Sequence, residues 1–256
     1  MASAGPSART TGTAAPVSDL GATAIVVTSN SQDHVVACLS ALRHAGLRVS
    51  VVDNASADGT VHVVAAHFPE IELIANPVHV GFAAAVNQAL PGAVGNVVLL
   101  VDPECILREP TARALVTTLR LRPEVGVVGP RIIDPGGRLV ASAHPFGSLA
   151  LALTGRLSGN LAPLGLHQLF WGRKRRRTYA DCGRYGRAVT VDWVSGACLA
   201  VRASLLSEIG GLDEGSCMYY ADEELCLQAW RRGAQVLYVP ALTAVHLRRA
   251  SSRDAI

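Results

Sequence analysis

The sequence predicts an α/β fold in which helices cover both faces of a mostly parallel central β-sheet. Half of the 256 residues are hydrophobic and 17% are charged, as in globular proteins rather than disordered chains. In the first half of the chain, short apolar runs alternate with segments of helical spacing. This alternation favours β-α-β units, whose strands lie parallel and whose helices pack on the sheet.

The first half of the chain contains the clearest elements. Residues 24–28 are an apolar run typical of a buried strand, and Leu39 and Leu42 follow at helical spacing. In the same way, strands are expected at 24–28, 49–52, 71–75 and 97–101, and helices at 33–45, 58–68 and 81–90. In such a sheet, ligands bind beyond the carboxyl ends of the strands, where Asp53 and Asp102 lie.

The second half of the chain is less regular. Strands are expected at 125–128, 189–193 and 236–239, and helices at 203–210 and 222–232. The segment Asp-Pro-Gly-Gly at 134–137 predicts a turn within a hairpin, whereas 148–187 favours no element. We expect one domain over residues 20–256, preceded at 1–19 by a disordered lead rich in Ala, Ser, Thr, Gly and Pro.

Charge, cysteines and hydropathy restrict the compartment and the partners. A net charge of +3 is too small to indicate nucleic acid binding, and the absence of a CxxC pair among six cysteines favours reduced, structural thiols in the cytoplasm. Residues 1–19 lack the apolar core of a signal peptide, and we find no membrane-spanning apolar run. The basic run at 173–177 predicts either a solvated face or peripheral contact with anionic lipid at the inner face of the plasma membrane.

Acidic side chains follow two of the expected strands. Asp53 is placed to accept hydrogen bonds from a ribose hydroxyl or a pyrimidine N–H; the alternative is a strand end followed by a helix cap. Asp102 and Glu104 suit a divalent cation such as Mg²⁺, together with phosphate oxygens of a substrate. The alternative for this pair is a turn with two solvated acids.

Two further positions carry chemistry. Asp222 is the first of three consecutive acids at the beginning of an expected helix. Either the helix dipole explains these acids, or one of them is a general base towards a hydroxyl. His246 is either structural or a contact to metal or phosphate. The chain contains no Gly-x-Gly-x-x-Gly after its first strand, no P-loop and no Gly-x-Ser-x-Gly, which argues against dinucleotide binding, P-loop chemistry and a hydrolase serine.

Taken in order, these segments resemble the family 2 glycosyltransferases of the GT-A fold, and in particular their bacterial rhamnosyltransferase-like branch. The likeness extends from about residue 24 to residue 253. Each segment is common by itself, but the ordered set is specific. It consists of Thr-Ser-Asn at 28–30, Val-Asp-Asn-Ala-Ser-Ala-Asp-Gly-Thr at 52–60, Gly-Phe-Ala-Ala-Ala-Val-Asn at 81–87, Asp-Pro-Glu at 102–104, Asp-Trp-Val-Ser-Gly-Ala-Cys at 192–198, Gly-Gly-Leu-Asp-Glu at 210–214, the acidic helix start and His246.

The resemblance implies a role for each matching position. Residues of about 20–105 would form a nucleotide-binding half and residues of about 106–256 an acceptor half, with Asp222 as catalytic base. Contacts to the nucleotide sugar would come from Thr28, Asn30, Asp53, Asn54, Gly81, Asn87 and Asp102. The metal, Mg²⁺ or Mn²⁺, would be held by Asp102, Glu104 and His246, and the acceptor would meet Trp193, Ser195 and Gly196.

The resemblance also implies the reaction. An inverting single displacement would move a sugar, expected to be rhamnose from dTDP-rhamnose, to a hydroxyl of a cell-envelope glycan or polyprenyl-linked acceptor. The sequence departs from the family's pattern at His79, Glu104 and Ala221, where asparagine, aspartate and glutamate are usual. One alternative is a catalytically weak or inactive binding protein of this fold. The other is a nucleotidyltransferase, which would need a glycine- and basic-rich signature after the first strand.

Overall fold

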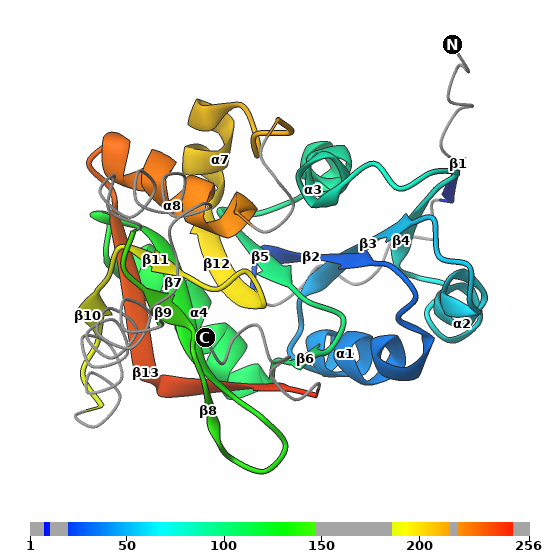
Figure 1. Ribbon diagram of the computed structural model, residues 1–256, viewed down its shortest axis with the longest axis horizontal. Helices are drawn as coiled ribbons and strands as arrows, with labels where there is room; N and C mark the ends of the chain where they lie inside the picture. The colour runs from blue at the N-terminus through cyan, green and yellow to red at the C-terminus, as the bar shows by residue number, and fades with distance from the viewer. Residues whose placement is uncertain (1–7, 11–19, 147–185, 216–219, 248–256) are drawn as a thin grey trace, which may run out of the picture.

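One twisted β-sheet forms the centre of the molecule, and helices cover both of its faces (Figure 1). This computed structural model describes residues 8–10, 20–146, 186–215 and 220–247. The strands are β1 (Ala8–Thr10), β2 (Ala22–Thr28), β3 (Arg48–Asn54), β4 (Glu72–Asn76), β5 (Val97–Val101), β6 (Cys105–Ile106), β7 (Val125–Ile133), β8 (Leu139–Val140), β9 (Ala143–His144), β10 (Val189–Thr190), β11 (Trp193–Val194), β12 (Cys198–Arg202) and β13 (Gln235–His246). The helices are α1 (Gln32–His44), α2 (Thr60–His67), α3 (Phe82–Ala89), the 3-10 turn η1 (Leu90–Gly92), α4 (Glu109–Leu121), α7 (Ala203–Ile209) and α8 (Ala221–Arg231).

The strand order confirms a mostly parallel sheet. The order is β4-β3-β2-β5-β12-β7-β13, with β1 beside β4 and β10 beside β13. Strand β2 pairs in parallel with β3 and β5, as do β3 with β4 and β7 with β13. Strand β12 is antiparallel to both of its neighbours, β5 and β7. Because of this reversal, the residues that precede β12 lie at the same edge of the sheet as the residues that follow β2, β3 and β5.

Two hydrophobic clusters fill the two sides of the sheet. Helices α1, α2 and α4 pack on one side, and α3, α7 and α8 pack on the other (Figure 1). Neighbouring strand residues alternate between the clusters, so that Leu99 belongs to the first and Leu100 to the second. Burial of one such side chain contributes about 1.5–3 kcal/mol. The continuous apolar runs of the central strands therefore stabilise both sides of the sheet.

Most of the predicted elements are confirmed, with ends that differ by one or two residues. The predicted strand at 189–193 is wrong as a single element, because the chain changes sheets at Asp192. Strand β10 pairs with β13, whereas β11 pairs with β9. The strands predicted at 125–128 and 236–239 are longer than expected, since β7 and β13 pair in parallel along most of their length. The hairpin turn at 134–137 is confirmed between β7 and β8.

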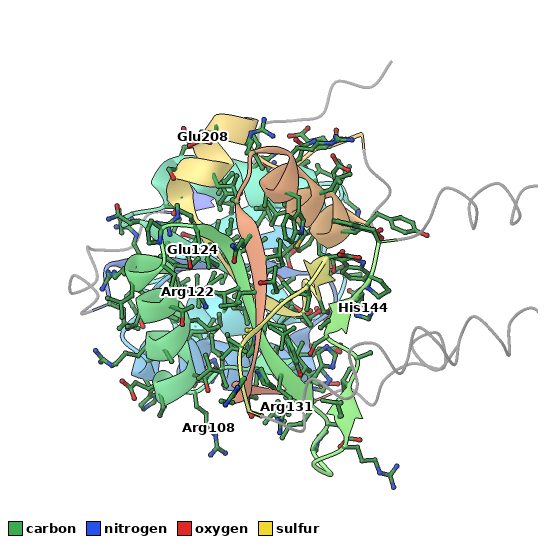
Figure 2. The ribbon with its side chains drawn as sticks, turned by 90° about the vertical axis from the view of Figure 1, so that its left-hand side faces the viewer. Arg108, Arg122, Glu124, Arg131, His144 and Glu208 are labelled. Carbon is green, nitrogen blue, oxygen red and sulfur yellow. The ribbon has the colours of Figure 1, made fainter. Side chains whose placement is uncertain are left out.

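Helix α4 and strand β6 lie in a segment without a predicted element. The signal for α4 was present: Pro110 lies in its first turn, and Leu115 and Leu119 are buried at helical spacing. Arg202 of β12 completes the helix end by donating hydrogen bonds to the carbonyl oxygens of Leu119 (2.6 Å) and Arg122 (3.0 Å). Figure 2 shows Arg122 at this end of α4. The end of the helix is thereby tied to the central sheet.

Residues 8–10 differ from the prediction of a disordered lead at 1–19. They form β1, which pairs antiparallel with β4, because an edge strand offers unpaired N–H and C=O groups to any extended segment nearby. The rest of the predicted lead, and the basic run at 173–177 with its expected lipid contact, lie outside the described residues. Over the described ranges, no helix combines the length and the apolar character needed to cross a membrane.

We predict that Gly95 is required by a close approach between backbones. Its φ is +88°, and an added Cβ would lie 2.0 Å from the carbonyl oxygen of Gly21. Gly137, with φ +77° and nothing within 4 Å of an added Cβ, is the matched control. Gly137→Ala should cost about 1–2 kcal/mol, from the left-handed backbone alone. Gly95→Ala should cost about 1–3 kcal/mol more, from the clash. Urea denaturation measures both losses, and equal losses would show that the approach to Gly21 tolerates a side chain.

Candidate active site

Two carboxylates and an imidazole gather at the edge of the sheet where β5 ends. The N–H groups of Cys105 and Glu104 donate to the carbonyl oxygen and the carboxylate of Asp102, each at 2.8 Å, and so fold Asp-Pro-Glu into a tight turn. His246 ends β13 opposite Cys105, and Leu247 N–H donates to the carbonyl oxygen of Glu104 at 2.8 Å. One ligand atom each from Asp102, Glu104 and His246 lie within 4.8 Å of one another. The two carboxylates fit a divalent cation that prefers oxygen, such as Mg²⁺ or Mn²⁺, and the imidazole of His246 offers a third ligand atom.

Asp53 lies buried at the end of β3, with its carboxylate fixed by its neighbours. Its Oδ1 accepts hydrogen bonds from the hydroxyl groups of Thr28 (2.8 Å) and Ser56, and its Oδ2 accepts one from Ser56 N–H at 2.9 Å. A carboxylate has about four acceptor positions. Among the described residues, these three donors leave capacity for one more N–H or O–H, which a base or a ribose would supply.

The loops after β2 and β3 are joined to each other in a strained conformation. Asn30 and Ala55 have φ values of +52° and +60°, which residues other than glycine rarely adopt. Asn30 N–H donates to the hydroxyl of Ser56, and Ala57 N–H donates to the side-chain oxygen of Asn30, each at 2.8 Å. Strain of this kind persists where the surrounding structure overdetermines it, and it gathers at binding sites. The loops around Asp53 are therefore held in one shape before any ligand arrives.

Asn54 shapes the beginning of helix α3. Its amide nitrogen donates to the carbonyl oxygen of Gly81 at 3.1 Å, and its side-chain oxygen accepts from Val80 N–H at 2.9 Å. Gly81 has φ +91°, and an added Cβ would meet nothing within 4 Å. Space therefore remains open beside Gly81. Asn54 and Gly81 lie at the predicted donor edge, and the side chain of Asn54 acts there on the backbone.

Asp222, at the beginning of α8, is held against the loop that precedes β12. Its Oδ2 accepts a hydrogen bond from Gly196 N–H at 2.7 Å, and its Oδ1 accepts one from Glu223 N–H at 2.9 Å. Burial raises the pKa of the Asp222 carboxyl above its usual value, and the hydrogen bonds from Gly196 and Glu223 oppose that rise. A carboxylate that binds a proton more readily than usual suits the role of general base.

An aromatic pair stands beside this loop. The rings of Trp193 and His144 are stacked, with centroids 4.1 Å apart and an angle of 19° between their planes. They face each other because β9 and β11 pair antiparallel, and Figure 2 labels His144 on β9. Ser195 N–H donates to the carbonyl oxygen of Ser142 at 3.1 Å. Nothing in the sequence indicated His144, because its place depends on the pairing of two strands far apart in the chain.

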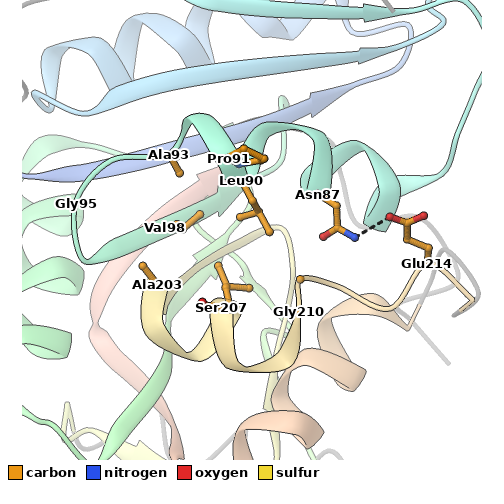
Figure 3. Close-up of a pocket in the computed structure, with 12 residues that line it drawn as sticks. Asn87, Leu90, Pro91, Ala93, Gly95, Val98, Ala203, Ser207, Gly210 and Glu214 are labelled. Atoms are coloured by element: carbon orange, nitrogen blue, oxygen red, sulfur yellow. Dashed lines mark hydrogen bonds between the residues drawn. The ribbon is translucent and has the colours of Figure 1, made fainter. Parts of the chain in front are cut away.

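Asn87 lies apart from these groups, at a cavity of about 480 Å³ between α3, η1 and α7 (Figure 3). Its side chain forms hydrogen bonds with the backbone of Leu212 and the carboxylate of Glu214. Of the described residues that line the cavity, Asn87 alone was predicted as a site residue. The other predicted donor residues lie at the carboxyl edge of the sheet. Direct contact of Asn87 with a donor stays a prediction.

The fold agrees with comparisons to known proteins. The family model described as glycosyltransferase like family 2 matches residues 21–256. The chain is a family 2 glycosyltransferase. It is 28% identical over 237 residues to an N-acetylglucosaminyl-diphospho-decaprenol L-rhamnosyltransferase of Mycobacterium tuberculosis, an alignment that covers 87% of this chain and 74% of that protein.

Other relatives of this family 2 glycosyltransferase are longer. A pre-mycofactocin glycosyltransferase of Mycobacterium tuberculosis is 28% identical over 91% of this chain, which spans 44% of that protein. Among solved structures, a mannosyltransferase from Pyrobaculum calidifontis, in complex with GDP-Man and Mn²⁺, aligns with a TM-score of 0.62 and 21% identity. That alignment covers 93% of this chain and 60% of the mannosyltransferase. The glycosyltransferase therefore has the GT-A fold.

Buried thiols pack beneath the acidic edge of this glycosyltransferase. The four described cysteines, Cys38, Cys105, Cys198 and Cys226, are free and buried, as expected for structural thiols. The Sγ of Cys38 donates to the carbonyl oxygen of Asp102 at 3.6 Å, and burial raises the pKa of its thiol. Burial likewise raises the pKa of Cys226 to about 12. The thiols of Cys38 and Cys226 therefore stay protonated near neutral pH and add no charge to the site.

The raised pKa of Asp222 predicts a pH dependence of stability. Because the folded state favours the protonated carboxyl, the contribution of Asp222 to folding is greatest below the usual pKa of 3.8 and is lost as the pH rises through the raised pKa. The unfolding free energy of the wild type minus that of Asp222→Asn should therefore fall as the pH rises above the usual pKa of 3.8.

Asp58 provides the control of opposite sign for this measurement. Burial acts to raise the pKa of Asp58, but hydrogen bonds from Thr60 and Gln32 together lower it. The corresponding difference for Asp58→Asn should therefore increase with pH. Urea denaturation at several pH values measures both differences. A difference for Asp222 that is independent of pH would contradict its raised pKa.

Proposed function

We propose that this family 2 glycosyltransferase transfers rhamnose from dTDP-rhamnose to a hydroxyl of a polyprenyl-linked or other cell-envelope glycan, with inversion. One observation carries the proposal: two adjacent residues connect the candidate base to the candidate diphosphate site. Gly196 N–H donates to Asp222 Oδ2 at 2.7 Å, and the carbonyl oxygen of Ala197 accepts from Asp102 N–H at 3.0 Å. A single displacement needs the base and the departing diphosphate at fixed positions relative to each other, and this dipeptide contacts both candidate sites.

On the donor side, the chain would hold the nucleotide at the ends of β2 and β3. Asp53 has an acceptor position for a base N–H or a ribose hydroxyl, and Thr28 and Asn30 fix the loops around it. Asn54 and Gly81 shape the neighbouring open space. The strained loops need little reorganisation on binding, which favours affinity.

On the diphosphate side, Asp102, Glu104 and His246 would hold Mg²⁺ or Mn²⁺. A bound divalent cation supplies positive charge that offsets the charge of the departing nucleoside diphosphate. The mannosyltransferase from Pyrobaculum calidifontis, which was solved with GDP-Man and Mn²⁺, supports the same class of cofactor here. The Cys38 thiol, which contacts the carbonyl oxygen of Asp102, has a raised pKa and adds no competing charge.

In the transfer step, a carboxylate oxygen of Asp222 would take the proton of the acceptor hydroxyl. The hydroxyl oxygen then forms a bond to the anomeric carbon on the face opposite the diphosphate. The bond between that carbon and the diphosphate oxygen breaks, and its electron pair leaves with the nucleoside diphosphate. A general base of this kind contributes roughly 10²–10⁴-fold to rate. Gly196 contacts Asp222, and Trp193 and Ser195 come just before it in the chain. An acceptor would approach at these three residues.

The relatives support the proposed acceptor class. The name of the 28% identical rhamnosyltransferase gives a lipid-linked acceptor, N-acetylglucosaminyl-diphospho-decaprenol, and we propose a related polyprenyl-linked glycan for this chain. Such an acceptor would place the reaction in the cytoplasm, at the inner face of the plasma membrane. The basic run at 173–177 is the proposed contact with anionic lipid, and it lies outside the described residues.

The proposal predicts a specific pattern of turnover. Incubated with a panel of nucleotide sugars and Mg²⁺ or Mn²⁺, the wild type should consume dTDP-rhamnose fastest. Asp222→Asn should lose roughly 10²–10⁴-fold in transfer, while its affinity for dTDP stays near that of the wild type. Release of nucleoside diphosphate measures turnover, and calorimetry measures affinity. Normal turnover by Asp222→Asn would refute the base assignment. No turnover with any donor would favour the binding-protein alternative.

Metal dependence is tested at Glu104. Loss of even an outer-shell partner of a metal ligand typically costs 10–100-fold in affinity. Because Glu104 is proposed as a direct ligand, Glu104→Ala should weaken Mn²⁺-dependent binding of dTDP by at least about tenfold. Glu104→Asp should retain most of the binding. Glu109→Ala removes an exposed carboxylate that pairs with Arg113 on α4 and should change nothing. Identical calorimetric titrations for Glu104→Ala and Glu109→Ala would remove Glu104 from the metal site.

A further inference from the structure

The side chain of Asn87 makes a contact that the role of donor ligand does not explain. Its amide nitrogen donates to the carbonyl oxygen of Leu212 at 2.8 Å and to the carboxylate of Glu214 at 2.9 Å. Its oxygen accepts from Leu212 N–H at 2.8 Å. Figure 3 shows Asn87 projecting from α3 towards Glu214. Both amide hydrogens and one lone pair are therefore used within the protein.

Gly211 permits this contact. An added Cβ at Gly211 would lie 2.6 Å from the side-chain oxygen of Asn87, and the φ of Gly211 is +92°. The chain thus needs a residue without a side chain at 211 so that its backbone can reach Asn87. Helix α3 and the segment 211–214 are therefore joined by three hydrogen bonds, and the missing side chain at Gly211 leaves room for them.

The contact joins helix α3 to a hydrophobic cluster that also holds α8. Helix α3, which carries Asn87, begins at the loop that Asn54 holds beside Asp53. The side chain of Leu212 is buried in the same hydrophobic cluster as Leu225 of α8, the helix that begins beside Asp222. The backbone of Leu212 is fixed by Asn87 while its side chain packs in the cluster that supports α8.

We propose that Asn87 is a positioning residue for sugar transfer: it holds the segment 211–214, and through it the beginning of α8, in the register that presents Asp222. In this assignment Asn87 does not touch the donor. The inference rests on the proposed role of Asp222 as base. A donor ligand would affect dTDP affinity, whereas a positioning residue affects kcat with affinity unchanged.

Three variants test the proposal. Asn87→Ala removes the contact. Gln88→Ala is the matched control, because Gln88 on the same helix exchanges two side-chain hydrogen bonds with Asn76, at 3.0 and 3.1 Å, away from the segment 211–214. Glu214→Ala removes only the exposed partner of Asn87 and carries the test if Asn87→Ala does not fold. For each variant, kcat, dTDP affinity and hydrogen exchange at the Leu212 amide are measured.

The expected result is a split between rate and affinity. Asn87→Ala should lower kcat at least tenfold, leave dTDP affinity within twofold and raise hydrogen exchange at Leu212 at least tenfold. Glu214→Ala should lower kcat by a few fold with affinity unchanged. Gln88→Ala should leave both kcat and the exchange of Leu212 within twofold. Weaker dTDP affinity with normal kcat in Asn87→Ala would overturn the proposal in favour of direct donor contact. Normal kcat and affinity despite faster exchange would also overturn it.

A double variant ties the effect to the partner. Asn87→Asp places a carboxylate against that of Glu214 and against the carbonyl oxygen of Leu212, so kcat should fall more than in Asn87→Ala. Adding Glu214→Gln removes one of these repulsions and should recover several fold of the loss. The same loss with and without Glu214→Gln would contradict the proposal. If Asp222→Asn turned over normally, the base assignment would fail, yet the exchange result would still report whether Asn87 holds the segment.

Discussion

The reversed strand β12 is the constraint on which the site depends. It is antiparallel to both β5 and β7, so its beginning lies where β5 ends. Gly196 and Ala197, just before β12, bond to Asp222 and to Asp102. If β12 ran parallel to its neighbours, this dipeptide would lie at the opposite edge of the sheet. One reversal therefore joins the part of the chain that carries the acidic turn to the part that carries the candidate base.

The two sides of this junction are held by different physical means. On the donor side, side-chain hydrogen bonds within the loops after β2 and β3 fix Asp53 and its neighbours in a strained shape. On the acceptor side, Asp222 is fixed mainly by backbone N–H groups. Backbone donors tie the position of the base to the sheet itself. The aromatic pair of Trp193 and His144 stands beside the loop that precedes β12, and the pairing of β9 with β11 holds the two rings together.

Local pattern was enough to predict the parallel strands and the acids that follow them, because each depends on a few consecutive residues. It was not enough for contacts that need register between distant strands. His246 reaches Asp102 and Glu104 only because β13 continues past 239 and pairs with β6. His144 faces Trp193 for a similar reason. Asn87 was assigned from its motif, while its partners at 212 and 214 follow from packing of α3 against the second half of the chain.

The proposed role of Asp222 as base is compatible with Ala221, which stands where a glutamate is usual. Ala221 is buried at the beginning of α8. Burial is what raises the pKa of Asp222, and no neighbouring charge contributes to the rise. A second carboxylate at position 221 would be desolvated next to the first, and its repulsion would raise the pKa of Asp222 further. With alanine there, desolvation by burial raises the pKa of Asp222 without a neighbouring charge at position 221. Alanine at position 221 thus removes a charge from the site and leaves the contacts of the proposed base intact.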